Sequence, residues 1–329
     1  MKLGRNTDDY SRPKLDLTEL AASADFSMVP PSADYRPAAQ LQMLGNDVAG
    51  DCEAARWANH RLLMTGAYPA SVMDDVWAVY KTQNPNFDPN GDPNTTGPGS
   101  PADGGMSSDQ LLSYLHSTGG PDGSKVVAYG LIDPRNVQAV ERAIALFGGV
   151  WVDILVQPGN QTEFANRQPW TDTGEQPEGG HAVLADGYVP QRRFLTWADE
   201  TTFADSFWNG STQEGPLVER VYLVIWPEHA TKEFIASQGA QQLAADYQAL
   251  TGKTLVWPDA PTPTPPAPVP PTPPSPVGAS FLVSDPSVVD HIVHVAARRG
   301  VDPNVWVTQH FEHYFRVAAL VAEDLALFD

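Results

Sequence analysis

The hydrophobic residues of this 329-residue chain change their spacing about halfway along it. In the first half they recur every three or four positions, as on one face of a helix, within residues 52–66, 107–116 and 136–146. Later they alternate or run together in short stretches bounded by turn residues, at 150–156, 181–188, 194–197 and 218–226. Helices followed by several strands predict an α+β fold and not an alternating, doubly wound sheet.

Prolines divide the chain into segments. Of the 31 prolines, 11 fall between Pro258 and Pro276, and such a run favours an extended polyproline II spacer that cannot bury a core. We therefore predict an N-terminal arm (1–30), a large domain (31–257), a proline-rich polyproline II linker (258–278) and a C-terminal module (279–329). Two alternatives stay open. The proline run also has the composition of a ligand for an aromatic groove of another protein. The arm is either a remnant pro-segment or a segment that binds a neighbouring protein.

The C-terminal module, 279–329, has the pattern of a helical hairpin. Asp285-Pro286 and Asp302-Pro303 supply the cap and first-turn signals of two helices. Because about 50 residues without a disulfide or a metal seldom fold alone, we expect this module to self-associate or to dock on another protein. Four of its histidines have helical i, i+3 spacing, but we interpret them as boundary residues and predict no metal: His291, His294, His310 and His313.

Composition narrows the choice of partners. The chain has 40 acidic against 20 basic side chains, a net charge of −20, which argues against nucleic-acid binding and against docking on anionic membranes. Its single cysteine rules out an intrachain disulfide and a thiolate zinc cage, and we expect no cofactor. No stretch has the length and apolarity of a membrane span, and no apolar run follows Lys2 and Arg5 as in a signal peptide. These features predict a soluble protein, either cytoplasmic or packaged inside a particle.

The single cysteine has a candidate partner among the eight histidines. Cys52 stands at the predicted start of the helix 52–66, where unpaired backbone N–H groups and the helix dipole lower the pKa of a thiol. A nucleophilic thiolate needs a base, and His181 has the best setting, at the head of a buried strand behind Gly179-Gly180. An inert core cysteine is the alternative that these two residues alone leave open.

The order of several motifs resembles the papain-like cysteine peptidases over most of residues 31–226. The motifs are Pro31-Ser32-Ala33-Asp34-Tyr35-Arg36, Asn46 six residues before Cys52, Gly104-Gly105 before a helix, and Gly180-His181-Ala182-Val183 followed by Gly187-Tyr188. Cys52 and His181 lie 129 positions apart, which fits a papain-like layout better than that of the compact amidases. The resemblance implies a helical subdomain against an antiparallel β subdomain or barrel.

The resemblance also implies roles for individual residues. Cys52 would attack a carbonyl, His181 would carry the proton, and Asn46 would help to hold the oxyanion. The family's orienting asparagine has no counterpart in this sequence. We therefore expect Asp199 to orient His181, with Glu200 as the second choice.

The residues beside the cysteine depart from the family's usual pattern. Asp51 and Glu53 place a carboxylate on each side of the thiol, which raises its pKa. Two functions follow. The first is a papain-like cysteine peptidase or amidase that acts on a protein or peptide substrate. The alternative is a non-enzymatic structural or interaction protein that uses an inactive scaffold anchored by its C-terminal helices.

The chain also has a more specific likeness, carried by its start and by one box. The MKLG start and the GNDxxGDC box at 45–52 resemble papain-like proteins of actinobacteria and their phages. This likeness implies a virion-associated protein, and for the non-enzymatic alternative a structural component of the virion.

Overall fold

The computed structural model describes residues 2–8, 14–18, 32–188, 192–210 and 216–258. The chain divides into two units, Met1–Thr264 and Pro265–Asp329, and every described residue lies in the first. The predicted hairpin at 279–329 and the linker beyond Pro258 lie outside the described residues. The segment boundaries drawn from the prolines therefore stay predictions.

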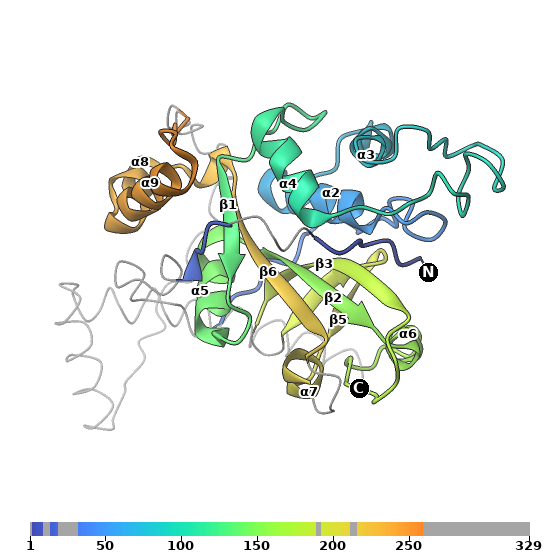
Figure 1. Ribbon diagram of the computed structural model, residues 1–329. Helices are drawn as coiled ribbons and strands as arrows, with labels where there is room; N and C mark the ends of the chain where they lie inside the picture. The colour runs from blue at the N-terminus through green and yellow to red at the C-terminus, as the bar shows by residue number, and fades with distance from the viewer. Residues whose placement is uncertain (1, 9–13, 19–31, 189–191, 211–215, 259–329) are drawn as a thin grey trace, which may run out of the picture. The chain divides into compact units, whose positions relative to one another are not determined.

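A single antiparallel sheet forms the centre of the described unit (Figure 1). Its order is β1 (Ala128–Ile132), β6 (Val218–Ile225), β2 (Val150–Val156), β3 (Gly179–Gly187), β4 (Arg193–Thr196) and β5 (Asp199–Thr202). Successive residues of a strand point to opposite faces, so an apolar strand such as β2 supplies side chains to two cores. Val150 and Val152 belong to one core, and Trp151 between them belongs to the other.

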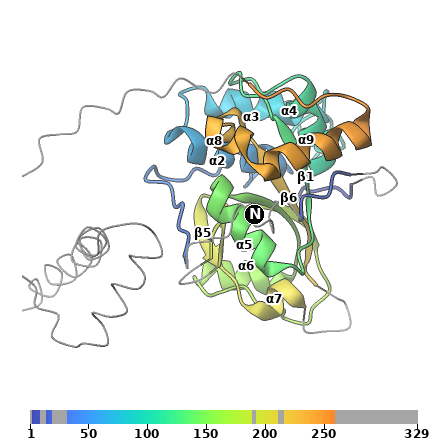
Figure 2. The ribbon, with the colours of Figure 1, turned by 90° about the vertical axis from the view of Figure 1, so that its left-hand side faces the viewer.

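Helices cover both faces of the sheet (Figures 1 and 2). One face carries α2 (Cys52–Thr65), α3 (Val72–Lys81) and α4 (Ser108–Ser117). The other carries α5 (Val137–Phe147), α6 (Pro158–Ala165) and α7 (Asp205–Asn209). After β6 the chain makes a short 3-10 turn, Pro227–His229, and then forms α8 (Lys232–Ala236) and α9 (Gln238–Thr251).

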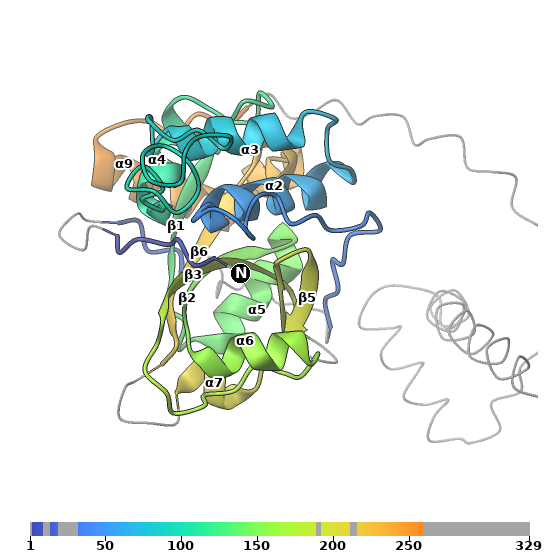
Figure 3. The ribbon, with the colours of Figure 1, turned by 90° about the vertical axis from the view of Figure 1, so that its right-hand side faces the viewer.

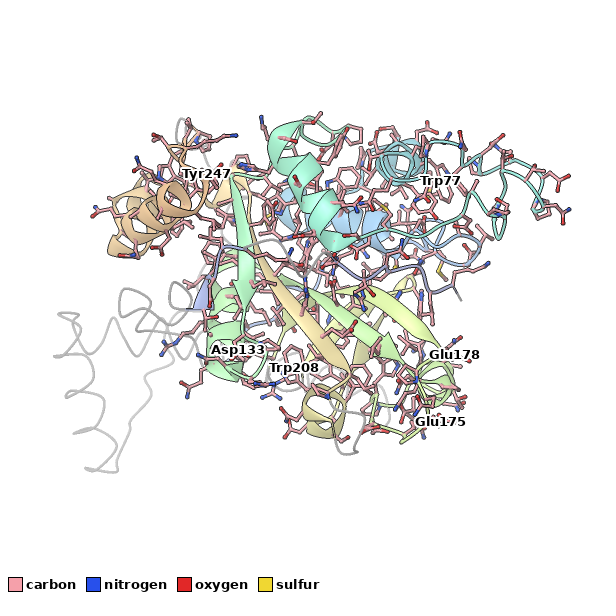
Figure 4. The ribbon with its side chains drawn as sticks, in the orientation of Figure 1. Trp77, Asp133, Glu175, Glu178, Trp208 and Tyr247 are labelled. Carbon is pink, nitrogen blue, oxygen red and sulfur yellow. The ribbon has the colours of Figure 1, made fainter. Side chains whose placement is uncertain are left out.

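The two cores differ in what packs on the sheet. In Figure 4, Trp77 lies in the α2–α4 layer, where it packs against the core that contains Trp151 (the first core), and Trp208 lies on α7 in the core that contains Val150 and Val152 (the second core). In the second core, Trp208 stacks on Phe203 with ring centroids 5.3 Å apart. The expected α+β class is confirmed, with helices on both faces of an antiparallel sheet.

Local sequence signals explain where the predicted helices begin and end. The Ser107 hydroxyl caps α4 by accepting from the Gln110 N–H, and the Asn136 side chain caps α5 by accepting from the Ala139 N–H. Gly148 ends α5 in the left-handed conformation at φ 71°, which a glycine adopts without strain. In the part of the chain that the structure describes, no helix combines the length and apolarity needed to cross a bilayer.

Candidate active site

The first turn of α2 brings Cys52 against β3. Cys52 is the first residue of the helix and only 1% of it is exposed. Backbone N–H groups of Ala182 and Gly4 are directed at its thiol. Burial raises the pKa of the Cys52 thiol to about 12, the Glu53 charge adds to the rise, and these two amides oppose it. The lowered pKa expected from the helix dipole is therefore wrong for this state, because desolvation outweighs the dipole.

The imidazole of His181 is held on two sides. Its Nε2 lies 2.6 Å from the Thr196 hydroxyl, and its ring stacks on Trp197 with centroids 4.5 Å apart. Its Nδ1 is buried and has no hydrogen-bond partner. Burial lowers the pKa of His181 to about 3, helped by the positive charges of Arg56 and Arg5. The site therefore contains a neutral imidazole with one nitrogen uncommitted.

The cysteine and the histidine lie close together without a hydrogen bond between them. The thiol faces the main chain of Ala182, the residue that follows His181 in β3. Because Nδ1 has no partner and Nε2 is committed to Thr196, the imidazole makes no bond to the sulfur in this state. The structure thus places the thiol of Cys52 against the backbone of the residue that follows His181.

Asp199 does not orient His181 in this structure. Its carboxylate is 53% exposed and lies 3.9 Å from the Arg167 guanidinium. Glu200, the second choice, pairs instead with Arg36 at 2.9 Å. The reason lies in the β4–β5 turn, where Trp197 and Ala198 adopt left-handed backbone angles and Thr196 is paired with Asp199 across the hairpin. The hairpin therefore places the Thr196 hydroxyl on the histidine and points Asp199 outward.

Asn46 lies in the loop before α2 and is already engaged. Its side-chain amide donates to the Asp51 carboxylate at 3.2 Å, and its carbonyl accepts from the Lys2 N–H at 3.1 Å. Burial raises the pKa of Asp51 well above its usual range, against the opposing effect of the Asn46 bond. Asn46 is thus buried near the thiol, with its amide directed at Asp51.

A buried ionic cluster lies beneath the candidate nucleophile. It consists of Glu53 and Arg56 on α2, Ser108 on α4 and Asp153 on β2, and the three charged side chains are fully shielded from solvent. Arg56 bonds Glu53 and lies 2.8 Å from Asp153. The Ser108 hydroxyl lies 2.7 Å from both carboxylates. Glu53, which the sequence indicated as an obstacle to a thiolate, is thus partly compensated by Arg56.

Residues 2–8 form an extended segment that runs between α2 and β3 (Figures 1 and 3). On one side, the Met106 N–H donates to the Gly4 carbonyl at 2.8 Å and the Asn6 N–H donates to the Met106 carbonyl at 2.6 Å. On the other side, the Arg5 N–H donates to the Gly180 carbonyl at 3.1 Å. The segment is therefore hydrogen-bonded on both sides. It runs parallel to the chain at Met106 and antiparallel to the chain at Gly180.

Glycines allow this segment and the neighbouring backbone to approach each other closely. A Cβ on Gly4 would lie 2.0 Å from the Gly50 carbonyl oxygen, and one on Gly105 would lie 2.2 Å from the Gly4 oxygen. A Cβ on Gly180 would lie 2.7 Å from the Arg5 oxygen and 2.9 Å from its guanidinium. Such contacts are far shorter than any van der Waals approach, so each of these positions requires glycine.

Sequence reasoning missed Thr196, Trp197 and the segment 2–8 as parts of this site. A weak signal existed for the first two, a hydroxyl and an indole at the end of the strand after His181. For the segment, the signal was the set of glycines on both sides of the groove. Within the described ranges, no three His, Cys, Asp or Glu side chains are grouped as metal ligands.

Comparisons with known proteins give distant structural likenesses only. No protein-family model matches the sequence, and neither does any curated protein. Xylellain, a cysteine protease from Xylella fastidiosa, is similar at 15% identity and a TM-score of 0.45, over 68% of this chain and 95% of that one. The Carica candamarcensis cysteine protease CMS1MS2, in complex with E-64, is similar at 17% identity and a TM-score of 0.39, over 60% of this chain and 98% of that one. Likenesses this distant carry no conclusion about function, which has to come from the site itself.

Proposed function

We propose that the described domain is a latent cysteine peptidase or amidase of the papain-like type. The observation that supports this proposal is the placement of two side chains. The thiol of Cys52 faces the residue next to His181, and the His181 ring is fixed by Thr196 while its Nδ1 has no partner. A base with one nitrogen anchored and the other uncommitted, beside a nucleophile, is the arrangement that acyl transfer requires.

The proposed reaction uses these groups in sequence. His181 takes the thiol proton, and the sulfur of Cys52 attacks the substrate carbonyl carbon to form a tetrahedral oxyanion. In this proposal the Cys52 N–H and the Asn46 amide, once released from Asp51, are the donors for that oxyanion. As the C–N bond breaks, the leaving amine takes the proton from His181, and a water then hydrolyses the thioester. Once the imidazole has moved onto the sulfur, Thr196 holds its Nε2 through the remaining steps.

The latent character of the site comes from the segment 2–8. This segment places the Gly4 amide on the thiol, and its main chain is hydrogen-bonded to Met106 and Gly180 where we propose that a substrate binds. While it is in place, burial keeps Cys52 as a neutral thiol with a pKa of about 12. Displacement of the segment would admit water and substrate, lower the pKa of the thiol and let the imidazole move onto the sulfur.

A non-enzymatic scaffold is the second candidate, and one observation favours it. The imidazole and the thiol make no hydrogen bond. Under this alternative the groove is permanently closed, and the chain is a structural or interaction protein, such as a virion component, attached through residues 279–329. Both candidates share the expectation that this C-terminal segment binds a protein partner or a second copy.

Labelling of Cys52 distinguishes the two candidates. Because Cys52 is the chain's single cysteine, intact-mass spectrometry after treatment with a peptidyl acyloxymethyl ketone reports on this site alone. We expect labelling when Arg5→Ala releases the segment 2–8, and this labelling should fall by about 100-fold or more when His181→Ala is added, the usual size of a general-base contribution. Labelling that is absent in every variant, or equal with and without His181, would establish the scaffold.

A further inference from the structure

We propose that the pocket filled by the Arg5 side chain is a subsite for a basic side chain of a bound peptide. The proposal rests on the proposed function, in that the groove beside Cys52 receives a peptide. It adds the substrate class, a peptide with arginine at the position that Arg5 now holds.

The pocket is built from two carboxylates on the sheet. The Arg5 guanidinium lies 3.9 Å from Asp153 on β2 and forms an ion pair with Glu219 on β6. Its side chain is only 3% exposed, Asp153 is fully buried and Glu219 is 26% exposed. A guanidinium reaches two separate acids with different nitrogens, which suits arginine better than the point charge of lysine.

Main-chain contacts on both sides of Arg5 do not depend on sequence. Met106 and Gly180 bond the backbone of the segment through their N–H and carbonyl groups, as neighbouring strands do. An extended peptide with glycine at the position of Gly4 can make these bonds. At this position the selection therefore comes from the side chain, and Gly180 leaves the space that the guanidinium occupies.

The charges around the pocket require a cation there. Arg56 serves Glu53 and Asp153, and Arg220 lies 3.1 Å from Asp8. If residues 2–8 left the groove together, Asp8 would go with Arg5, and three carboxylates would then face two guanidiniums. A buried carboxylate without a partner is strongly unfavourable. Opening of the groove is therefore favoured when an incoming basic side chain replaces Arg5.

The pocket can be tested in the full chain without any catalysis. Arg5→Ala empties it, and thermal unfolding is then followed with Nα-acetyl-argininamide or with Nα-acetyl-citrullinamide, which has nearly the same shape but no charge. We expect argininamide to raise the melting temperature of Arg5→Ala and citrullinamide to leave it unchanged. Adding Glu219→Gln should weaken the argininamide effect about tenfold or more, the size of one charged hydrogen bond.

A matched control removes an arginine that lines no pocket. Arg36 is 56% exposed and pairs with Glu200, so Arg36→Ala should not respond to argininamide. Equal responses to argininamide and citrullinamide, or an argininamide response that Glu219→Gln leaves intact, would overturn the proposal. If Arg5→Ala does not fold, Arg5→Ser also leaves the pocket empty and takes its place in every arm.

A labelling arm separates failure of the pocket from failure of the proposed function. Two peptidyl acyloxymethyl ketones, identical except for arginine or citrulline at the subsite position, are reacted with Cys52 in the full-length Arg5→Ala chain. A preference of about tenfold or more for arginine is expected. Equal labelling by both would contradict the arginine pocket and still support the proposed enzyme. Argininamide binding without any labelling would support the pocket and contradict the proposed enzyme.

Discussion

Two buried polar groups of residues adjoin each other on α2 and on the neighbouring strands β2 and β3, and they differ in how their hydrogen-bonding atoms are matched. In the ionic cluster of Glu53, Arg56, Ser108 and Asp153, all four carboxylate oxygens have a hydrogen-bond partner. In the candidate site, the His181 Nδ1 has none. The first arrangement joins α2, α4 and β2 into one body.

The difference shows what each group is for. A buried polar atom without a partner is unfavourable, so a protein keeps one where its function requires it or where a displaced partner returns. In the cluster every carboxylate oxygen is bonded without any ligand, although the buried Nε of Arg56 has no hydrogen-bond partner. The site is complete only when a partner reaches Nδ1, and we propose that this partner is the thiol of Cys52, which faces the adjacent residue Ala182.

The largest expected effect comes from breaking the cluster. Arg56→Met would leave Glu53 and Asp153 buried together without their shared cation, and we expect a loss of about 3–5 kcal/mol in the free energy of unfolding. Urea unfolding followed by circular dichroism measures this loss. Arg36→Met removes an exposed ion pair as a control and should change the stability by about 0–1 kcal/mol. Similar losses in both variants would show that the cluster does not hold α2, α4 and β2 together.

The next effect comes from Gly180→Ala, which would drive the segment 2–8 out of the groove. The added Cβ would lie 2.7 Å from the Arg5 oxygen, so we expect overpacking to destabilise the bound segment by about 1–3 kcal/mol. Iodoacetamide should then alkylate Cys52 about tenfold faster or more, because the covered fraction falls. Gly179→Ala is the control, since its Cβ would meet only the Leu3 side chain at 3.3 Å. An unchanged rate in Gly180→Ala would mean that the segment does not guard the thiol.

Acid should reveal the buried neutral histidine. The pKa of His181 falls from 6.5 to about 3 on folding, so between these values the unfolded chain binds a proton that the folded chain does not. The stability that the neutral His181 contributes to the folded chain is complete above pH 6.5. It is lost as the pH falls towards 3, by about 1.4 kcal/mol per pH unit. His181→Gln should flatten the measured slope by that amount. Parallel slopes for the two chains would contradict the burial of a neutral imidazole.

The smallest effect on stability is expected at Thr196. Thr196→Val keeps the shape of the side chain and removes the hydroxyl that contacts His181 Nε2. We expect the free energy of unfolding to fall by about 1 kcal/mol. Its effect on peptidyl ketone labelling should be larger than this, because the imidazole loses its orientation. Thr196→Ser should restore labelling. If valine and serine behave alike, the hydroxyl does not position the base.

The sequence predicted those parts of the fold that depend on local signals. Ser107, Asn136 and Gly148 mark helix ends because capping acts within a few residues. Alternation and apolar runs located four of the six strands, including β3 with His181. The strand β5 was missed because its residues, Asp199 to Thr202, are polar and carry no apolar pattern.

The remaining features depend on distant pairing that no local pattern encodes. Asp199 was chosen by its distance along the chain from His181, but the register of the β4–β5 hairpin decided that Thr196 faces the ring. The segment 2–8 has neither helical nor alternating apolar spacing. Its position is set by backbone bonds to Met106 and Gly180, about 100 and 175 residues further on. The same distant packing raised the pKa of Cys52, where the helix dipole alone would have lowered it.

The most direct test of the latent site is the pH dependence of Cys52 alkylation by iodoacetamide, in the wild-type chain and in Arg5→Ala. With the segment in place, the wild-type rate should stay low at neutral pH and rise only as the pH approaches the thiol pKa of about 12. In Arg5→Ala, we expect rapid alkylation near pH 7 that is lost when His181→Ala is added. Two results would contradict the claim that residues 2–8 cover a thiol that His181 activates. One is superimposable profiles for the wild-type chain and Arg5→Ala, and the other is profiles that His181→Ala leaves unchanged.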